Sequence, residues 1–474
     1  MNASALAEQL DGKTGSVLDR KETVRLAILT GPILPTLLRL SLPTIAVLVA
    51  QTLVGIAETY YVSRLGTDAL VGVSVVFPVW MLMTMMSAGG LGGGVASAVA
   101  RAIGSGRTQD ADDHLLHAIV LGTFMGTSFM LGMWLFGGGL FAKLGATNGA
   151  LRQALSYSNW LFVSAIPIWI VNLCSAALRG VGNVRSPALV TLFGAIVLIP
   201  LSPLLIFGFG PFKGFGIAGA GIAVALYYGT ACVVLISHLL GSHAGLTFRI
   251  RPLRWRLFRE VLSVGVISSL SAVQLNLTVV LMTATVGHFG AAALAGYGVG
   301  SRLDYLFIPV LFGLGSAVLT MVGTSIGADN LVRAKRVALV GTALGAGFTG
   351  IIGLAVAVYP PLWLNIFTSD PVVLETGQTY LHAVAPFYVA MGTTFILGFV
   401  SQGAGRPGWT TFAGTIRLIV SAGVSWIAVE AWNADLQSIS FIIAAGQVSA
   451  ALVCLAALRF GLIWPPRAIS ANSC

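Results

Sequence analysis

Long uninterrupted apolar runs constrain this chain more than any other feature of its sequence. Of its 474 residues, 56% are hydrophobic and only 9% are charged. Soluble domains carry about 25% charged residues, and a helix needs about 20 apolar residues to cross a bilayer. The runs are too long and continuous for a membrane barrel, whose strands are short and alternating. We therefore predict an all-α membrane protein with twelve transmembrane helices, at 33–62, 69–100, 115–141, 153–178, 187–208, 216–240, 260–287, 292–325, 337–363, 378–401, 409–430 and 439–460.

The placement of basic residues explains the net charge of +10. Of the 26 Lys and Arg, 20 fall on the side of the predicted bundle that carries both termini. Arg302 and Arg417 fall within spans, and the remaining four are Arg64, Lys143, Arg152 and Lys213. Basic loops stay in the cytoplasm, so both termini are predicted to be cytoplasmic, with the protein in the cytoplasmic (inner) membrane. The basicity then serves topology and attraction to membrane lipids, and nucleic acid is not an expected partner.

The two halves of the chain resemble each other at an offset of 223 residues. Tyr157 aligns with Tyr380, and the glycines of LRGVGN (178–183) align with those of SQGAGR (401–406). The repeat predicts two pseudo-symmetric six-helix bundles: an N-lobe at 31–245 and a C-lobe at 260–465, joined by a basic cytoplasmic linker at 246–259. Residues 1–30 and 466–474 are expected to be tails. Six helices are an even number, so both lobes enter from one side, as in transporters that rock one lobe against the other.

Glu58 is the only ionisable residue between Arg39 and Arg64, inside the first apolar segment. A carboxylate in lipid costs a few kcal/mol unless it is paired, wetted or protonated, which makes it a candidate ion site. Gln51 shares its helical face at a spacing of seven, and Thr59 follows it directly. The alternative is structural: Glu58 reaches the headgroups or pairs with Arg64.

The second lobe has one intramembrane acid, Asp304, two residues after Arg302. Residues two apart on a helix point to nearly opposite faces, so these two charges need different partners. Either they face a cavity, with Asp304 as a second titratable group, or neighbouring helices satisfy them. Arg417 is predicted to lie near the cytoplasmic headgroups.

Other patterns carry little chemistry. Cys174, Cys232, Cys454 and Cys474 form no spaced pair, and GGLGGG (89–94) lacks the Lys-Ser/Thr end of a phosphate loop. His114 and His117, near three aspartates, sit at a helix start where acids favour the dipole. We expect no metal site, no cofactor and no enzymatic activity.

Several motifs in order resemble the multidrug and toxic compound extrusion (MATE) transporter family, over about residues 32–460. They are Pro43, Gln51 and AET (57–59), then LGTDAL (65–70), GGLGGGVASAVARAIGSGR (89–107), Tyr157, LRGVGNVRSP (178–187), SRLDYLFIPVLFGLGSAVLTMVGTSIGADN (301–330) and SQGAGRPG (401–408). The resemblance is closer to the DinF-like branch. It implies two lobes around a central cavity, with Glu58 in the place of the cation-coupling carboxylate.

The chain also departs from the family pattern. Where the DinF-like branch has an acidic partner in the fifth helix, this chain has Ser202. Where the NorM-like branch has acids in the seventh helix, it has Gln274 and Asn276. These residues, with Gln51, Thr59, Arg302 and Asp304, are the predicted cavity-lining set. One acid per lobe slightly favours a proton over sodium as the coupling ion.

The resemblance implies an antiporter that exports small organic compounds, often cationic or amphipathic, against inward flow of protons or sodium. A monomer is expected to suffice. The alternative is a flippase of the same superfamily that moves a lipid-linked precursor.

Overall fold

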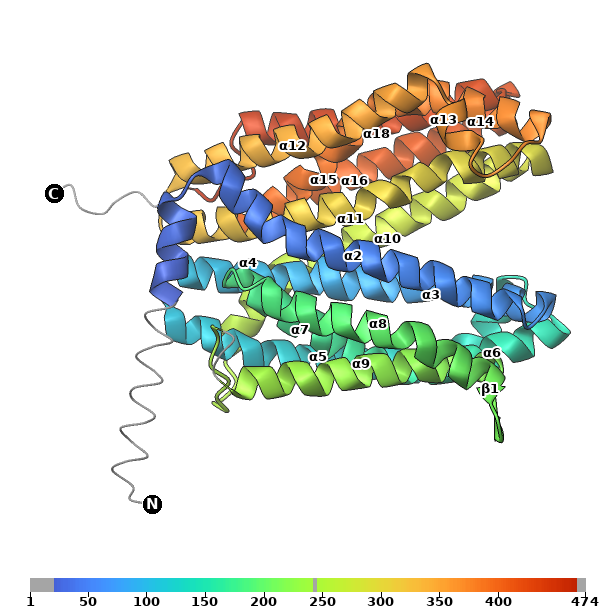
Figure 1. The fold of residues 1–474 in the computed structure, drawn as a ribbon. Coiled ribbons are helices and arrows are strands. Elements are labelled where there is room, and N and C mark those ends of the chain that lie inside the picture. The colour runs from blue at the N-terminus through green and yellow to red at the C-terminus, as the bar shows by residue number, and fades with distance from the viewer. Residues whose placement is uncertain (1–20, 242–244, 467–474) are drawn as a thin grey trace.

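The computed structural model describes residues 21–241 and 245–466, which form a bundle of long helices running along one direction (Figure 1). The first half contains α2 (Ile33–Ser63), α3 (Thr67–Met85), a π-helical turn (Met86–Leu91), α4 (Gly92–Gly104), α5 (Thr108–Lys143), α6 (Asn148–Val163), α7 (Ala165–Gly180), α8 (Arg185–Phe207), the hairpin β1 (Gly208–Phe209) and β2 (Phe212–Lys213), and α9 (Ile217–Leu240). The second half contains α10 (Trp255–Gly287), α11 (Ala291–Gly327), α12 (Leu331–Val358), α13 (Pro361–Leu364), α14 (Pro371–Val384), a 3-10 turn (Ala385–Phe387), α15 (Tyr388–Gly403), α16 (Gly408–Leu418), a π-helical turn (Ile419–Val424), α17 (Ser425–Trp432) and α18 (Leu436–Arg459).

The predicted membrane architecture is confirmed. Within the described residues, 11 helical segments are long and apolar enough to cross a membrane, and the bent pair α6–α7 makes a twelfth. The segment predicted as one helix at 153–178 is this pair, bent by 45° at Ser164. Pro167 lies in the first turn of α7, where its missing N–H breaks no helical bond, so a new helix starts there easily.

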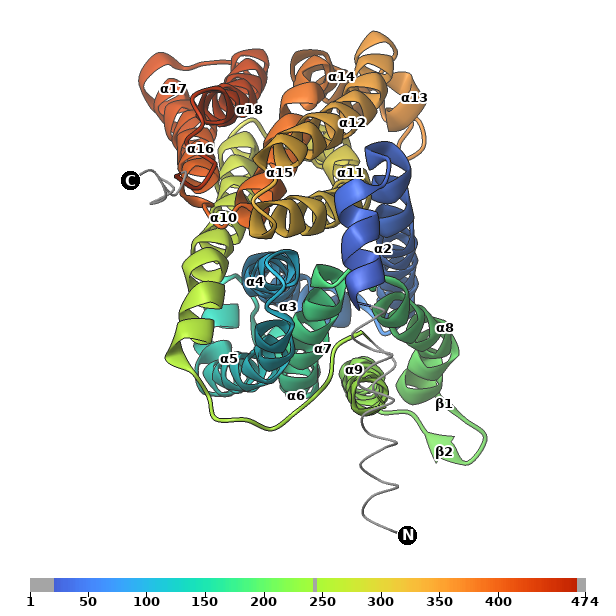
Figure 2. The ribbon, with the colours of Figure 1, turned by 90° about the vertical axis from the view of Figure 1, so that its left-hand side faces the viewer.

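Two helices cross between the bundles. The second-half core includes Leu37 and Leu40 from the start of α2, whereas Val54 and Val62 later in α2 pack with α8 and α9. In the same way, Val261 at the start of α10 belongs to the first-half core, and the end of α10 packs in the second-half core. Figure 2 shows α10 beside α4 and α5, and α2 beside α11. Each crossing helix therefore touches both lobes.

The lobes meet along a seam between α4 and the last part of α11. Every residue from Gly313 to Ser325 is buried, as is nearly all of α4. A Cβ on Gly104 would lie 2.1 Å from the carbonyl oxygen of Thr324, and one on Gly327 would lie 2.2 Å from that of Arg101. These two contacts exchange under the 223-residue offset, so a pseudo-twofold axis passes through the seam.

The packing is looser in the other half of the bundle. In α3 only Ala69, Gly72, Val76 and Met83 are buried. The ribbons of α3 and α10 diverge away from the seam (Figure 1). The lobes are thus closed at one end, here called the basic end, which carries residues 21–30, the linker and the starts of α5 and α10. We call the opposite end, with the β-hairpin, the far end.

An ion-pair network ties the basic end together. Arg256 pairs with Asp110 at 2.8 Å, and His114 Nε2 lies 3.3 Å from a carboxylate oxygen of Glu260. These contacts join α5 of the first half to α10 of the second. The remaining pairs join Arg107 to Asp110 and Glu260, Arg251 to Asp113, Arg254 to Asp110 and Asp113, and Arg256 to Glu260.

This network gives His114 a structural partner in Glu260. The structure of residues 21–30 corrects one prediction. No group of three or more potential metal ligands occurs within residues 21–241 and 245–466. Residues 21–30 are helical instead of a loose tail, because Lys21 pairs with Asp112 at 2.7 Å and Arg25 donates to the Gly104 carbonyl oxygen. The rest of the predicted tail, residues 1–20, lies outside the described residues.

Candidate functional site

Glu58 lies inside the N-lobe among tyrosines. Its carboxylate lies near enough to Tyr157 of α6 and to Tyr227 and Tyr228 of α9 for its charge to act on all three hydroxyls. One carboxylate oxygen is fully buried without a hydrogen-bond partner among the described residues. Gln51 lies seven residues before Glu58 on the same face of α2, and its side chain reaches the Tyr227 hydroxyl. The group is a buried acid surrounded by neutral hydroxyls, an arrangement suited to taking up a proton or a small cation.

The alternative in which Glu58 pairs with Arg64 is not observed among the described residues. Arg64 lies over the Tyr60 ring, 5.0 Å from its centroid, and hydrogen-bonds the Tyr60 hydroxyl. No ion pair of Glu58 occurs in the described part of the chain, where the acids in ion pairs are Glu22, Asp110, Asp112, Asp113 and Glu260.

The two predicted helpers of Glu58 lie in different surroundings. Thr59 is exposed, and its hydroxyl donates to the Gly55 carbonyl oxygen of its own helix at 2.9 Å, so its place in the cavity stays a prediction. A helical residue next to Glu58 is turned by about 100°, which carries it off the same face. Ser202 of α8 is fully buried, and its hydroxyl has no partner among the described residues. Its predicted contact with Glu58 is not among the observed hydrogen bonds.

Gln274 and Asn276 separate into two environments. The Gln274 amide donates to the Thr415 hydroxyl of α16 at 2.7 Å, inside the C-lobe, and its position on the central cavity stays a prediction. Asn276 donates to the Ala272 carbonyl oxygen at 3.0 Å and lies 3.4 Å from the Met85 sulfur. That second contact crosses between the lobes, so only Asn276 lies at their interface.

Arg302 and Asp304 point in different directions, as their spacing predicts. Arg302 is exposed, with its guanidinium 5.5 Å from the centroid of the Phe367 ring, and its role as a cavity charge stays a prediction. The Tyr388 hydroxyl and the Arg417 guanidinium act on the carboxylate of Asp304, although no ion pair or hydrogen bond joins them among the described residues. The position of Arg417 near the headgroups stays a prediction.

The two acids come from helices that the repeat does not relate, but each lies near a tyrosine that the repeat does relate. Tyr380 also faces Asp304, and Tyr380 is the repeat equivalent of Tyr157, which faces Glu58. Glu58 comes from α2, whereas Asp304 comes from α11, and neither position has an acidic repeat equivalent. The offset alone identifies the tyrosine pair, but it gives no sign that acids from unrelated helices would meet it.

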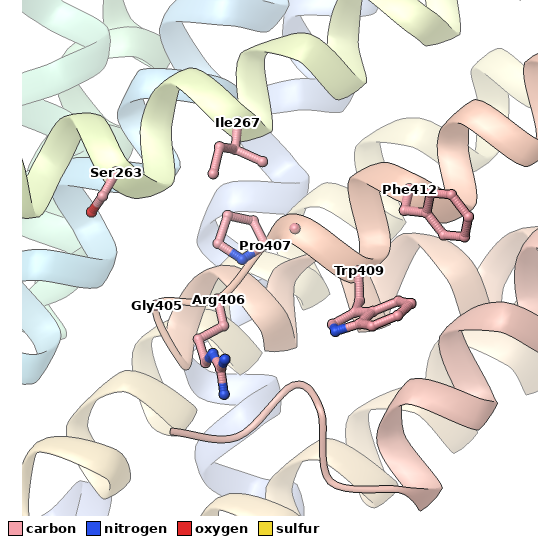
Figure 3. A pocket seen from close by; sticks show the side chains of 8 residues that line it. Ser263, Ile267, Gly405, Arg406, Pro407, Trp409 and Phe412 are labelled. Carbon is pink, nitrogen blue, oxygen red and sulfur yellow. The ribbon is translucent and has the colours of Figure 1, made fainter. Parts of the chain in front are cut away.

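A surface hollow lies elsewhere. It has a volume of about 480 Å³ and lies between α10 and the start of α16, lined by Ser263, Ile267, residues 405–409 and Phe412 (Figure 3). Arg406, at its edge, donates to the Trp464 carbonyl oxygen at 2.8 Å. None of the predicted site residues lines this hollow, so it supports no assignment.

A family model, MatE, matches residues 43–204 and 268–427, one stretch in each half of the chain. The chain belongs to the MatE family. The match covers both repeats, which agrees with the two bundles and the seam between them. It does not distinguish branches, so closeness to the DinF-like branch stays a prediction.

MatE relatives and structures extend this result. The chain is 27% identical over 401 residues to a protein named FAD transporter from Shewanella oneidensis, covering 84% of this chain and 88% of the relative. It is 25% identical to a probable multidrug resistance protein NorM from Thermotoga maritima, covering 76% of this chain and 78% of the relative. A multidrug resistance MATE family transporter in an outward-facing conformation superposes with a TM-score of 0.83 at 23% identity, over 92% of this chain and 97% of that one. These proteins are transporters, and the structural likeness confirms the MatE fold.

Proposed function

We propose that this protein is a secondary active antiporter of the cytoplasmic membrane that exports small organic compounds. Export would be driven by inward flow of protons or sodium, with both termini in the cytoplasm. Relatives named for multidrug resistance support export of varied amphipathic compounds, cationic ones included. The relative named FAD transporter adds a flavin nucleotide as a second candidate substrate.

One observation carries the proposal: Glu58 has a carboxylate oxygen buried in the N-lobe, and no cationic side chain of the described residues forms an ion pair with it. An uncompensated carboxylate in a membrane interior is costly, so a sequence that retains it gains from its ability to bind and release a cation. The neighbouring groups are hydroxyls and an amide, with no second carboxylate in the described contacts. A proton needs no further ligands, whereas Na⁺ needs several oxygens, so the geometry favours a proton.

The seam supplies the conformational part of the mechanism. If the basic end is cytoplasmic, the packed seam closes the cytoplasmic side and leaves the far halves apart, which corresponds to an outward-facing state. Binding of an ion at Glu58 would favour one arrangement of the lobes over the other, and only such a differential interaction can drive the exchange. The helices α2 and α10, which touch both lobes, would transmit the change. A monomer contains all of these parts, and the proposal needs no cofactor or enzymatic step.

The test is dye efflux from proteoliposomes under separately imposed proton and sodium gradients. Wild type should respond to one gradient, and Glu58→Gln should reduce that response to background while the protein still inserts and folds. Thr52→Ala is the matched control, because Thr52 is an exposed residue of the same helix, outside the predicted site, whose hydroxyl donates to the Leu48 carbonyl oxygen. Gradient-driven efflux at the wild-type rate in Glu58→Gln would disprove the coupling role.

A further inference from the structure

Arg179 occupies an unusual position at the seam. It lies in the last turn of α7, and its guanidinium is 6.0 Å from the centroid of the Phe312 ring of α11. Within the described residues, Arg179 makes no ion pair, and its side chain donates no observed hydrogen bond. Arg179 is partly buried between the lobes, and a guanidinium there without a counter-charge loses part of its hydration, a cost that a bound anion would offset.

The other two interior arginines differ from Arg179 in their surroundings. Arg101 donates to the Ser97 hydroxyl. Arg417 makes no ion pair in the described chain, but the charge of Asp304 acts on it. Of the three, Arg179 has neither an acid acting on it nor a side-chain acceptor.

The repeat shows that the seam does not need this side chain. The Thr320 hydroxyl donates to the backbone carbonyl oxygen of Arg179 at 3.0 Å. In the other half, the Ser97 hydroxyl donates to the backbone carbonyl oxygen of Gln402, the repeat equivalent of Arg179. Both contacts use only the backbone of residue 179 or 402, and a glutamine fills the equivalent place. The guanidinium is thus an addition to one side of a pseudo-symmetric structure.

Both lobes surround this guanidinium. A small cavity of about 10 Å³ lies beside it, lined by Gly93 of α4, Phe312 and Ser316 of α11, and Phe399 of α15. That volume holds about one water molecule. The Ser316 hydroxyl is buried and has no partner in the described structure. Because the cavity lies between the lobes, any opening of the seam enlarges it and exposes Arg179, Ser316 and the phenylalanines together.

We propose that Arg179 binds the phosphate or carboxylate group of an aromatic organic anion, whose ring packs on Phe312 and Phe399. A guanidinium pairs with such groups through two parallel hydrogen bonds. Aromatic rings stack with their centroids about 4.5–7 Å apart, a range that includes the 6.0 Å between the Arg179 guanidinium and the Phe312 ring. The inference deepens the proposed transport function by naming a substrate class, and as a transport site it rests on that function. Binding itself requires no ion gradient, so it is measured independently of coupling.

The probes are flavin mononucleotide and riboflavin, which share one ring system and differ by a phosphate. Binding to purified protein is measured by flavin fluorescence at constant ionic strength. Wild type should bind flavin mononucleotide about 10-fold more tightly than riboflavin, as expected for one charge-assisted contact. Arg179→Gln should remove this difference, and Arg179→Lys should keep part of it, because lysine retains the charge without the planar fork. Arg302→Gln is the matched control, since it removes an arginine that also lies over a phenylalanine, but at the exposed far end.

The folding of each variant is checked by its thermal midpoint. If Arg179→Gln does not fold, the two single variants Arg179→Lys and Phe312→Leu carry the test instead. Equal affinity of wild type for the two flavins, no binding of flavin mononucleotide, or an unchanged preference in the Arg179 variants would overturn the proposal. Binding of phosphatidylglycerol through Arg179 without any binding of flavin mononucleotide would also overturn it, in favour of a lipid headgroup. Flavin mononucleotide binding by a wild-type protein that shows no gradient-driven efflux would leave the anion site standing and refute the antiporter.

Discussion

At the scale of single residues, the two buried acids differ in what compensates them. Glu58 faces only neutral groups, whereas Asp304 has the positive charge of Arg417 beside it. A cation approaching Asp304 meets repulsion from Arg417, while one approaching Glu58 does not. The pair in the C-lobe is therefore better suited to holding the lobe together than to binding metal ions.

The pair gives a stability prediction. Asp304→Asn leaves Arg417 buried and unpaired, which costs about 3–5 kcal/mol in comparable buried pairs, whereas removing both charges is far less harmful. The thermal midpoint in detergent should fall in Asp304→Asn and largely recover in Asp304→Asn with Arg417→Gln. The exposed Glu375→Gln serves as the control. Equal losses in the single and double variants would mean that the two charges do not compensate each other.

At the scale of elements, close approach of backbones defines the seam. The end of α4 and the end of α11 leave no room for a Cβ at Gly104 or Gly327. In membrane proteins, small residues permit this contact, because van der Waals packing replaces the hydrophobic effect between helices.

Gly104→Ala should push the seam apart by overpacking, at a cost of about 1–3 kcal/mol to the packed arrangement. A cysteine placed at Ser97, in a background without native cysteines, should then react with a thiol reagent roughly 10-fold faster, as a cost of that size predicts. Gly132→Ala on α5 is the control, since a Cβ there meets no atom within 4 Å. Unchanged labelling in Gly104→Ala would show that the contact tolerates a methyl group.

The sequence predicts elements better than it predicts partners. Apolar run lengths identify the spans, and the motif order identifies the family, because both are local properties of the chain. The partners of Asp304 are not predictable in this way, because Tyr388 and Arg417 lie 84 and 113 positions away with no periodic relation to it. Arg179 is one of the 20 Lys and Arg that the sequence predicts on the side of the bundle with the termini. The bend at Ser164 and the buried seam, which place Arg179 between the lobes, leave no mark in hydropathy. Its alignment with Gln402 was the available signal.

At the scale of the whole molecule, transport requires the seam to open and close. Ala100 and Gly323 face each other across it, with 2.9 Å between the Ala100 Cβ and a Cβ built on Gly323. Disulfides span about 3.5–4.5 Å between Cβ atoms, so a small shift permits one here.

Cysteines at 100 and 323, without the native cysteines, should form a disulfide under mild oxidation. The cross-linked protein should lose substrate efflux almost completely and regain it on reduction, with each single cysteine variant as control. The cross-link is followed by the change in electrophoretic mobility after cleavage between the lobes. Full efflux in the cross-linked protein would show that the lobes do not separate at this seam.

The crossing of α2 and α10 has a consequence for how the protein is made. Leu37 and Leu40 emerge early from the ribosome, yet the core that covers them includes Leu311 and Leu314 of α11, synthesised about 270 residues later. The first helix is therefore inserted before the residues that cover its start, and that part of its packing surface stays incomplete until the second bundle has been inserted. The two halves therefore pack together only late in synthesis, and an N-terminal half released alone would lack the α11 residues that cover the start of α2.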